Sequence, residues 1–212
     1  MADSDAVEGD WLLATSQTGG RGRRGRQWQS PQGNLYASTL VILRDDDPPA
    51  QTLSFVAVWS LWGAAGVSPA ALKWPNDIVV DDRKLAGILL ERSGDRVVAG
   101  FGLNVAVAPD LPDRKTARVF DYRVDGADAA SIARDLEWLF ADNLGRWRRE
   151  GFEPFRKLWM SEGPQIGDSL KVDLGNGMTV EGAYSGLADD GALRLVLASG
   201  KIEVIHAGEV EL

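Results

Sequence analysis

Arginine and glycine alternate in the short segment "QTGGRGRRGRQW" between Gln17 and Trp28. Glycines let backbone amides approach a ligand closely, and guanidinium groups are planar donors suited to phosphates and carboxylates. The arginines are Arg21, Arg23, Arg24 and Arg26. We expect a loop that binds an anionic ligand. A solvated basic turn or a nonspecific polyanion patch is the alternative that this segment alone leaves open.

Two familiar glycine-rich loops fit the segment poorly. Gly20, Gly22 and Gly25 have the G-x-G-x-x-G spacing of dinucleotide-binding turns, but "RQWQSPQGN" follows and cannot begin the helix that such a turn requires. A kinase loop is excluded because no H-R-D or D-F-G motif follows. There is also no G-x-x-x-x-G-K-[ST] phosphate loop in the sequence.

A second segment, "KWPNDIVVDDRKLAGILLE", carries polar groups at a break between two expected strands. Lys73, Asn76 and Asp77 lie at the break, and Lys84 comes seven residues after Asp77. Two strands joined at the "DDR" turn would bring Lys84 back to the break. The alternative is a surface lysine paired with an aspartate of the turn.

The composition excludes several classes of protein. The chain has 212 residues, 44% hydrophobic and 25% charged, as in ordinary globular proteins. It has no cysteine, so thiol nucleophiles, thiolate zinc sites and disulfides are excluded. A net charge of -8 opposes nucleic-acid binding. The sequence has no long apolar run and begins with acidic residues, so we expect a cytoplasmic protein.

The elements that position these segments can be read from hydrophobic patterns. We expect strands at 11–16 and 35–43, a helix at 51–66 that is apolar nearly all round and ends at Gly66, and further strands between 72 and 107. Residues 110–126 look irregular. A helix capped by Asp128 follows, and then a short aromatic segment at 152–162.

The pattern changes at Gly163. Short alternating strands separated by tight-turn sequences follow, which is typical of a small barrel. We therefore predict two domains, 1–162 and 163–212. The single histidine, His206, falls in the second and is expected to be an incidental surface residue.

Three blocks, "GRGRRGRQWQSPQGNLY", "KWPNDIVVDDRKLAGILLE" and "GFGLNV", resemble in order and spacing the signature blocks of bacterial biotin protein ligases. The resemblance covers essentially the whole chain. It implies an α+β fold, a mixed β-sheet flanked by helices as in class II aminoacyl-tRNA synthetases, with a small SH3-like C-terminal barrel. It also implies that biotin and MgATP form biotinoyl-5'-AMP, which then biotinylates a lysine of the biotin carboxyl carrier protein of acetyl-CoA carboxylase.

The resemblance also assigns roles to residues. Arg23 and Lys84 would be catalytic. Biotin and its adenylate would be bound by Gln17, Gly20, Arg21, Gly22, Arg23, Trp28, Lys84, Gly87, Gly102 and Asn104. The ATP phosphates would be bound by Arg24, Arg26, Lys73, Asn76 and Asp77. Asp77 would also hold Mg²⁺.

Two departures from the family pattern lead to further expectations. Many relatives carry an N-terminal DNA-binding domain, and this chain starts at the catalytic domain, so we expect no DNA binding. The family's Ser-Thr-Asn strand and its helix normally precede Gln17, whereas here residues 1–10 resemble only the end of that helix. Without two or three ligand hydrogen bonds of ~1 kcal/mol each, biotin affinity would fall roughly 10- to 100-fold. A homodimer is compatible with the sequence.

Three other functions remain alternatives. The first is a ligase for lipoate or octanoate, although octanoyl transferases need a cysteine that this chain lacks. The second is an impaired homologue that only binds the carrier domain or the adenylate. The third is a nonspecific nucleic-acid binder, whose binding would fall steeply with salt.

Overall fold

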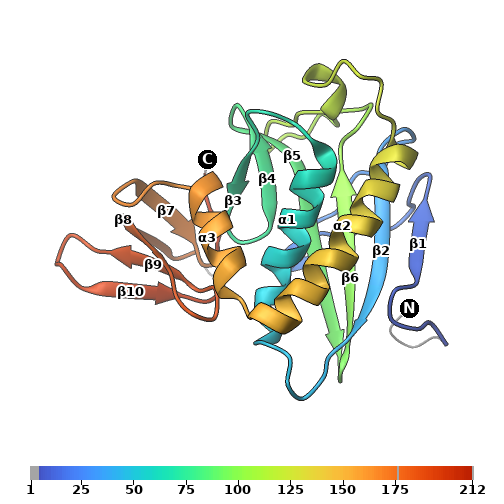
Figure 1. Cartoon of the computed structure of the whole chain (residues 1–212). Coiled ribbons are helices and arrows are strands. Elements are labelled where there is room, and N and C mark those ends of the chain that lie inside the picture. The colour runs from blue at the N-terminus through green and yellow to red at the C-terminus, as the bar shows by residue number, and fades with distance from the viewer. Residues whose placement is uncertain (1–4, 176, 212) are drawn as a thin grey trace.

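A six-stranded antiparallel sheet forms the centre of the molecule, in the order β1-β2-β6-β5-β4-β3 (Figure 1). The computed structural model describes residues 5–175 and 177–211. The strands are β1 Trp11–Ala14, β2 Leu35–Ile42, β3 Ala71–Lys73, β4 Asp77–Val80, β5 Arg83–Ser93 and β6 Arg96–Leu103. β1 and β2 begin and end within two residues of the predicted bounds, and the other four strands lie between 71 and 103, where further strands were expected.

The fold is α+β, as expected, but the sheet is not mixed. The pairs between its described strands are all antiparallel, and short turns join β3 to β6 in succession. The β4–β5 turn has Asp81 and Asp82 at φ 48° and 56°. Two consecutive positive φ values match the right-handed twist of the strands on either side of a two-residue hairpin. This turn sets the register that brings the start of β5 back alongside β4.

Two helices, α1 Leu53–Ala65 and α2 Ala129–Glu150, cover one face of this sheet (Figure 1). Helix α1 is buried on most sides and ends at Gly66, whose φ of 57° is the left-handed conformation that glycine adopts without strain. Asp128 caps α2 by accepting a 2.8 Å hydrogen bond from the Ser131 amide. Both helix ends confirm the sequence prediction.

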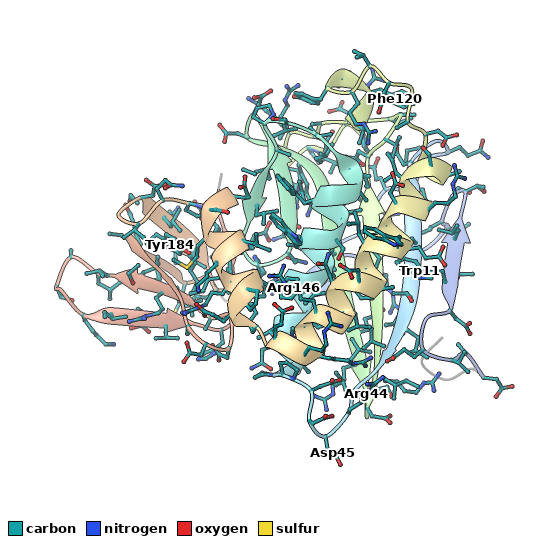
Figure 2. All side chains as sticks on the ribbon, in the orientation of Figure 1. Trp11, Arg44, Asp45, Phe120, Arg146 and Tyr184 are labelled. Carbon is teal, nitrogen blue, oxygen red and sulfur yellow. The ribbon has the colours of Figure 1, made fainter. Side chains whose placement is uncertain are left out.

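Aromatic packing ties the edge strand to the helices. Trp11 of β1 points toward α2 (Figure 2), with its ring 5.6 Å from Phe101 and 5.9 Å from Phe140. Aromatic pairs at this spacing add to the free energy of apolar burial. This contact fixes the strand from which the arginine loop departs.

The C-terminal part holds a helix and a second sheet. Helix α3 spans Glu153–Glu162, where the sequence predicted only an aromatic segment. The sheet has the order β10-β9-β8-β7-β11, with strands β7 Ser169–Asp173, β8 Thr179–Leu187, β9 Leu193–Val196, β10 Ile202–Ile205 and β11 Glu209–Val210. Trp74 joins it to the first sheet by a 3.1 Å hydrogen bond from Nε1 to the Gly191 carbonyl. The division into domains at residue 163 stays a prediction.

The N-terminal segment differs from the expected helix end. Residues 5–10 are not helical, whereas residues 1–4 lie outside the described residues. Gly9 has a φ of 91°, and the Glu8 carboxylate accepts hydrogen bonds of 2.7 and 2.8 Å from Arg148 of α2. A bidentate arginine pair fixes this segment against α2 without helical hydrogen bonds.

In the described part of the chain, no helix is both long and apolar enough to cross a membrane.

Candidate active site

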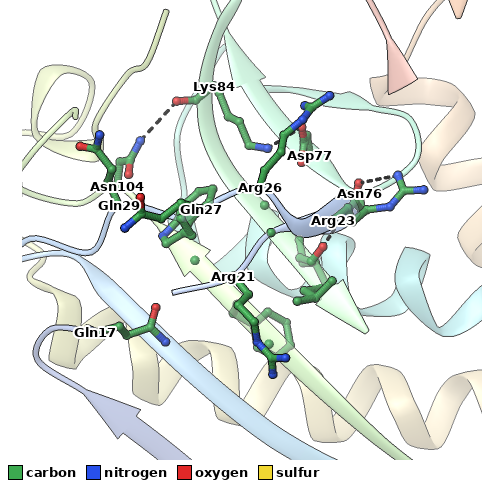
Figure 3. A pocket seen from close by; sticks show the side chains of 18 of the residues that line it. Gln17, Arg21, Arg23, Arg26, Gln27, Gln29, Asn76, Asp77, Lys84 and Asn104 are labelled. Carbon is green, nitrogen blue, oxygen red and sulfur yellow. Dashed lines mark hydrogen bonds and ion pairs between the residues drawn. The ribbon is translucent and has the colours of Figure 1, made fainter. Parts of the chain in front are cut away.

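A cavity of about 500 Å³ lies on the face of the six-stranded sheet that the helices leave free. Figure 3 shows the segment that carries Arg21, Arg23 and Arg26 in front of the sheet, with helices behind it. The cavity is lined by this segment, by facing residues of β5 and β6, and by residues of both the 109–116 loop and β11. Segments distant in sequence therefore enclose one space.

Paired residues of β5 and β6 form the floor of the cavity. Gly87 lies opposite Gly102, Leu89 opposite Gly100, and Glu91 opposite Val98. All six line the cavity, as expected when every second residue of a strand faces the same side. The floor therefore follows the strands for four residues, or about 13 Å at the usual strand rise.

Two glycines of the floor allow other groups to approach closely. A Cβ at Gly102 would lie 2.6 Å from the Trp28 ring. A Cβ at Gly87 would lie 3.1 Å from Asp77 Oδ1 and 3.3 Å from Lys84 Nζ. The contact at Gly102 is much shorter than carbon atoms normally make, so a side chain there would displace the indole, whereas one at Gly87 would crowd the charged pair by a few tenths of an ångström.

Lys84 and Asp77 form an ion pair at this end of the floor. Lys84 Nζ lies 2.7 Å from Asp77 Oδ2, and the side chains are only 15% and 9% exposed. The ammonium also lies 5.5 Å from the centre of the Trp28 ring, within range of a cation–π interaction. The prediction that the β4–β5 hairpin returns Lys84 to the break is confirmed, and Asp81 of the turn instead pairs with Arg83.

Two asparagines hold the strands around this ion pair. The Asn76 side chain donates to the Ile88 carbonyl, and its Oδ1 accepts a 3.3 Å hydrogen bond from Arg23. Asn104 is buried and donates from Nδ2 to the Ala117 carbonyl at 3.0 Å. Each side chain therefore joins segments that are remote in sequence.

The middle of the arginine loop contacts the C-terminal sheet. Arg23 donates a 3.3 Å hydrogen bond to the Gly208 carbonyl, Arg24 lies 3.3 Å from Asp173, and Arg26 lies 2.6 Å from Glu209. Burial is the main reason that the pKa of Arg23 is lowered, with a further contribution from the neighbouring arginine. Two of the arginines predicted to bind phosphates thus have carboxylate partners on the second sheet.

The base of the loop is closed by contacts around Gly20. The Trp28 amide donates a 2.9 Å hydrogen bond to the Gly20 carbonyl, and the Ser30 hydroxyl donates at 2.8 Å to Gln17 Oε1. A Cβ at Gly20 would lie between 2.4 and 2.8 Å from atoms of all three partners. Gly20 therefore closes the loop and does not line the cavity.

Lys73 is the other predicted site residue that the cavity lining does not include. It lies on β3 opposite Asp77 in the strand register. Burial lowers its pKa most strongly, while the charge of Asp77 acts in the opposite direction. The remaining predicted residues line the cavity: Gln17, Arg21, Gly22, Arg23, Arg24, Arg26, Trp28, Asn76, Asp77, Lys84, Gly87, Gly102 and Asn104.

The site residues predicted from the sequence do not include the 109–116 loop. The segment is irregular, as expected, yet it pairs with the start of β5: Lys84 donates a 3.0 Å backbone hydrogen bond to the Lys115 carbonyl, and Ala117 donates at 2.9 Å to the Lys84 carbonyl. Arg114, which lines the cavity, lies 3.7 Å from Glu209. The only signal in the sequence that this loop belongs to the site is its cluster of opposite charges.

Asn34, in the first signature block, was also missed. Its buried Oδ1 accepts hydrogen bonds from three successive amides, those of Val105, Ala106 and Val107, at 2.9 to 3.1 Å. Its Nδ2 donates to the Val107 carbonyl at 2.8 Å. The side chain thereby fixes the chain where it leaves β6, close to Asn104.

Comparison with known proteins agrees with this architecture. Residues 4–107 match the biotin/lipoate A/B protein ligase family, and residues 167–212 match the biotin protein ligase C-terminal domain. The biotin protein ligase from Aquifex aeolicus, in complex with biotin and ATP, superposes with a TM-score of 0.83 at 28% identity, over 99% of this chain and 91% of that one. The fold is thus that of a biotin/lipoate protein ligase.

Full-length relatives define the group more narrowly. A biotin--[acetyl-CoA-carboxylase] ligase from Paracoccus denitrificans is 37% identical over 94% of this chain and 89% of its own length. The bifunctional ligase/repressor BirA of Bacillus subtilis is 31% identical over 100% of this chain and 69% of its own length. The chain belongs to the biotin protein ligase family.

Proposed function

We propose that the protein is an ATP-dependent biotin protein ligase that forms biotinoyl-5'-AMP and transfers biotin to a lysine of the biotin carboxyl carrier protein of acetyl-CoA carboxylase. The observation that carries this proposal is the partly buried Lys84–Asp77 pair, which shares one cavity with the arginine loop. The relative from Paracoccus denitrificans is a biotin--[acetyl-CoA-carboxylase] ligase, and the Aquifex aeolicus enzyme binds biotin and ATP.

In the first step a biotin carboxylate oxygen attacks the α-phosphorus of ATP, and pyrophosphate leaves. Two anions must meet, so cations that neutralise both and hold them in line lower the barrier. Lys84 would bind the carboxylate at the Gly87–Gly102 end of the floor, and Arg23 would bind the α-phosphate from above. No protein nucleophile is required, which suits a chain without cysteine.

Arg24 and Arg26 would bind the outgoing phosphates. They now pair with Asp173 and Glu209. A triphosphate offers several charged acceptors to the same guanidinium groups, so we expect these pairs to be exchanged when ATP binds. Trp28 would cover the adenine side of the adenylate.

Mg²⁺ accompanies ATP and supplies charge neutralisation to the phosphates when it is bound. Among residues 5–175 and 177–211 there is no group of three acidic, histidine or cysteine side chains that could hold a metal. Mg²⁺ commonly binds through one or two carboxylates together with substrate phosphates. Asp77, a carboxylate lining the cavity, fits that mode, and we assign it this role.

In the second step the carrier lysine amine attacks the acyl carbon, the bond to the phosphate oxygen breaks and AMP leaves. The mixed anhydride must be kept from water until the carrier arrives. A loop with glycines for mobility and arginines for the anion can order over it. Arg23 would contribute one of the charges that retain the adenylate.

Transfer of biotin to a carrier domain tests the proposal. The protein is mixed with carrier domain, biotin and MgATP, and labelled carrier is detected with streptavidin. We expect labelling that disappears when the acceptor lysine is replaced by arginine. An unlabelled carrier, with circular dichroism showing an intact fold, would overturn the proposal and favour a protein that only binds the carrier or the adenylate.

A further inference from the structure

Arg21 makes a contact that separates it from the other arginines of its loop. Its Nη2 lies 3.0 Å from Glu91 Oε2, and the side chains are 71% and 48% exposed. Figure 3 shows the Arg21 side chain pointing away from Lys84, while Arg23 extends toward Asn76. The loop is therefore held at two separate places, Glu91 on the six-stranded sheet and the acidic residues of the C-terminal sheet.

Glu91 lies at the end of the floor remote from the Lys84–Asp77 pair. Along β5 it is four residues beyond Gly87 and faces the same side of the sheet. The floor beside it is apolar: Leu89 precedes it on the same face, and Val98 lies opposite it on β6. A ligand whose carboxylate meets Lys84 would therefore extend its apolar part toward Glu91.

We propose that Glu91 is a positioning residue that latches the arginine loop over the apolar end of the cavity through Arg21. The latch would set how long the acyl-adenylate is retained before the carrier arrives. This inference rests on the proposed function. To that function the inference adds Glu91, a residue that touches neither the reacting carboxylate nor the phosphates.

The exposure of the pair sets the strength of the latch. Ion pairs exposed to water change an equilibrium by a small factor, because solvent screens them and both side chains lose freedom. A weak latch suits a loop that must open to admit biotin and close over the product. We expect removal of the Glu91 charge to raise the open fraction of the loop about two- to fivefold.

Trypsin cleavage of the ligand-free protein tests the latch directly, because residues 21–26 contain four arginine cleavage sites. The Glu91→Gln variant should be cut in this loop about two- to fivefold faster than the natural chain. Glu203→Gln is the matched control, since Glu203 forms a 2.8 Å pair with Lys201 whose exposure is similar, 36% and 70%. Equal cleavage of the two variants would overturn the latch.

The rate at which biotinoyl-AMP is released tests whether the latch retains the adenylate. Each protein is loaded with biotin and MgATP, freed of excess ligand, and followed for the appearance of biotinoyl-AMP in solution. Glu91→Gln should release it two- to fivefold faster than Glu203→Gln, at equal unfolding temperatures. Faster cleavage with unchanged release would refute the role in retention. Failure of the natural chain to form any adenylate would refute the proposed function, and the cleavage comparison would still decide whether the latch exists.

Discussion

Replacing Lys84 with methionine removes one half of a partly buried ion pair and leaves Asp77 without its partner. Breaking a fully buried pair costs about 3–5 kcal/mol, because the remaining charge is uncompensated. This pair borders a cavity that water can enter, which lowers the penalty. We therefore expect Lys84→Met to reduce the free energy of unfolding by about 2–3 kcal/mol, measured by urea denaturation.

A double variant separates stability from catalysis. When Asp77→Asn accompanies Lys84→Met, no unpaired charge remains, and most of the lost free energy should return. Adenylate formation, measured as the release of pyrophosphate, should be absent in both variants because the cation that binds the biotin carboxylate is gone. If the single variant loses less than about 0.5 kcal/mol, the pair is effectively solvated. If the double variant forms adenylate, Lys84 is not the group that binds the carboxylate.

Three further substitutions test other parts of the structure. Asn34→Leu would leave three backbone amides without acceptors and should cost about 3 kcal/mol or more in urea denaturation; a loss below about 1 kcal/mol would show that water replaces the side chain. Gly102→Ala would push the Trp28 ring away by about 1 Å and should lower kcat/KM about 100-fold, whereas unchanged kinetics would contradict close contact. The hydrogen bond from Arg148 lowers the pKa of Glu8, and burial, which acts in the opposite direction, does not outweigh it. The ionised Glu8 therefore stabilises the fold fully above about pH 4.5, and this stabilisation is lost as the pH falls further. The difference in Tm between Glu8→Gln and the natural chain should vanish in acid. A difference that stays constant with pH would show that the Glu8–Arg148 pair does not stabilise the fold.

The strands and long helices follow from local sequence because their signals are local. The apolar run before Gly66 and the cap at Asp128 define the ends of α1 and α2. The return of Lys84 toward Asp77 also follows, because the tight turn sets the first pairs of the hairpin. The register shift between Ile78 and Val79, which places Gly87 opposite Asp77, has no such local signal. Helix α3 was missed although its sequence carries local signals, namely a proline at the start, Glu153 in the first turn, and Phe155 and Trp159 four residues apart.

The partners of the arginine loop could not be predicted. Nothing in the spacing of residues 17–28 indicates that Asp173 and Glu209, about 150 residues or more away, neutralise Arg24 and Arg26. The participation of the 109–116 loop is similarly hidden, because an irregular segment has no periodicity from which its direction can be inferred. Both depend on how the two sheets come together.

Glu209 gives the second sheet a thermodynamic link to the ligands, because this residue of β11 forms part of the cavity wall. A ligand that binds only when both sheets are folded stabilises both by the same free energy. Saturation with nucleotide should therefore protect the amides of β7 and β11 from hydrogen exchange, although most of these residues do not touch the ligand. The two parts of the chain would then unfold as one cooperative unit in the loaded enzyme, even if they separate when it is empty.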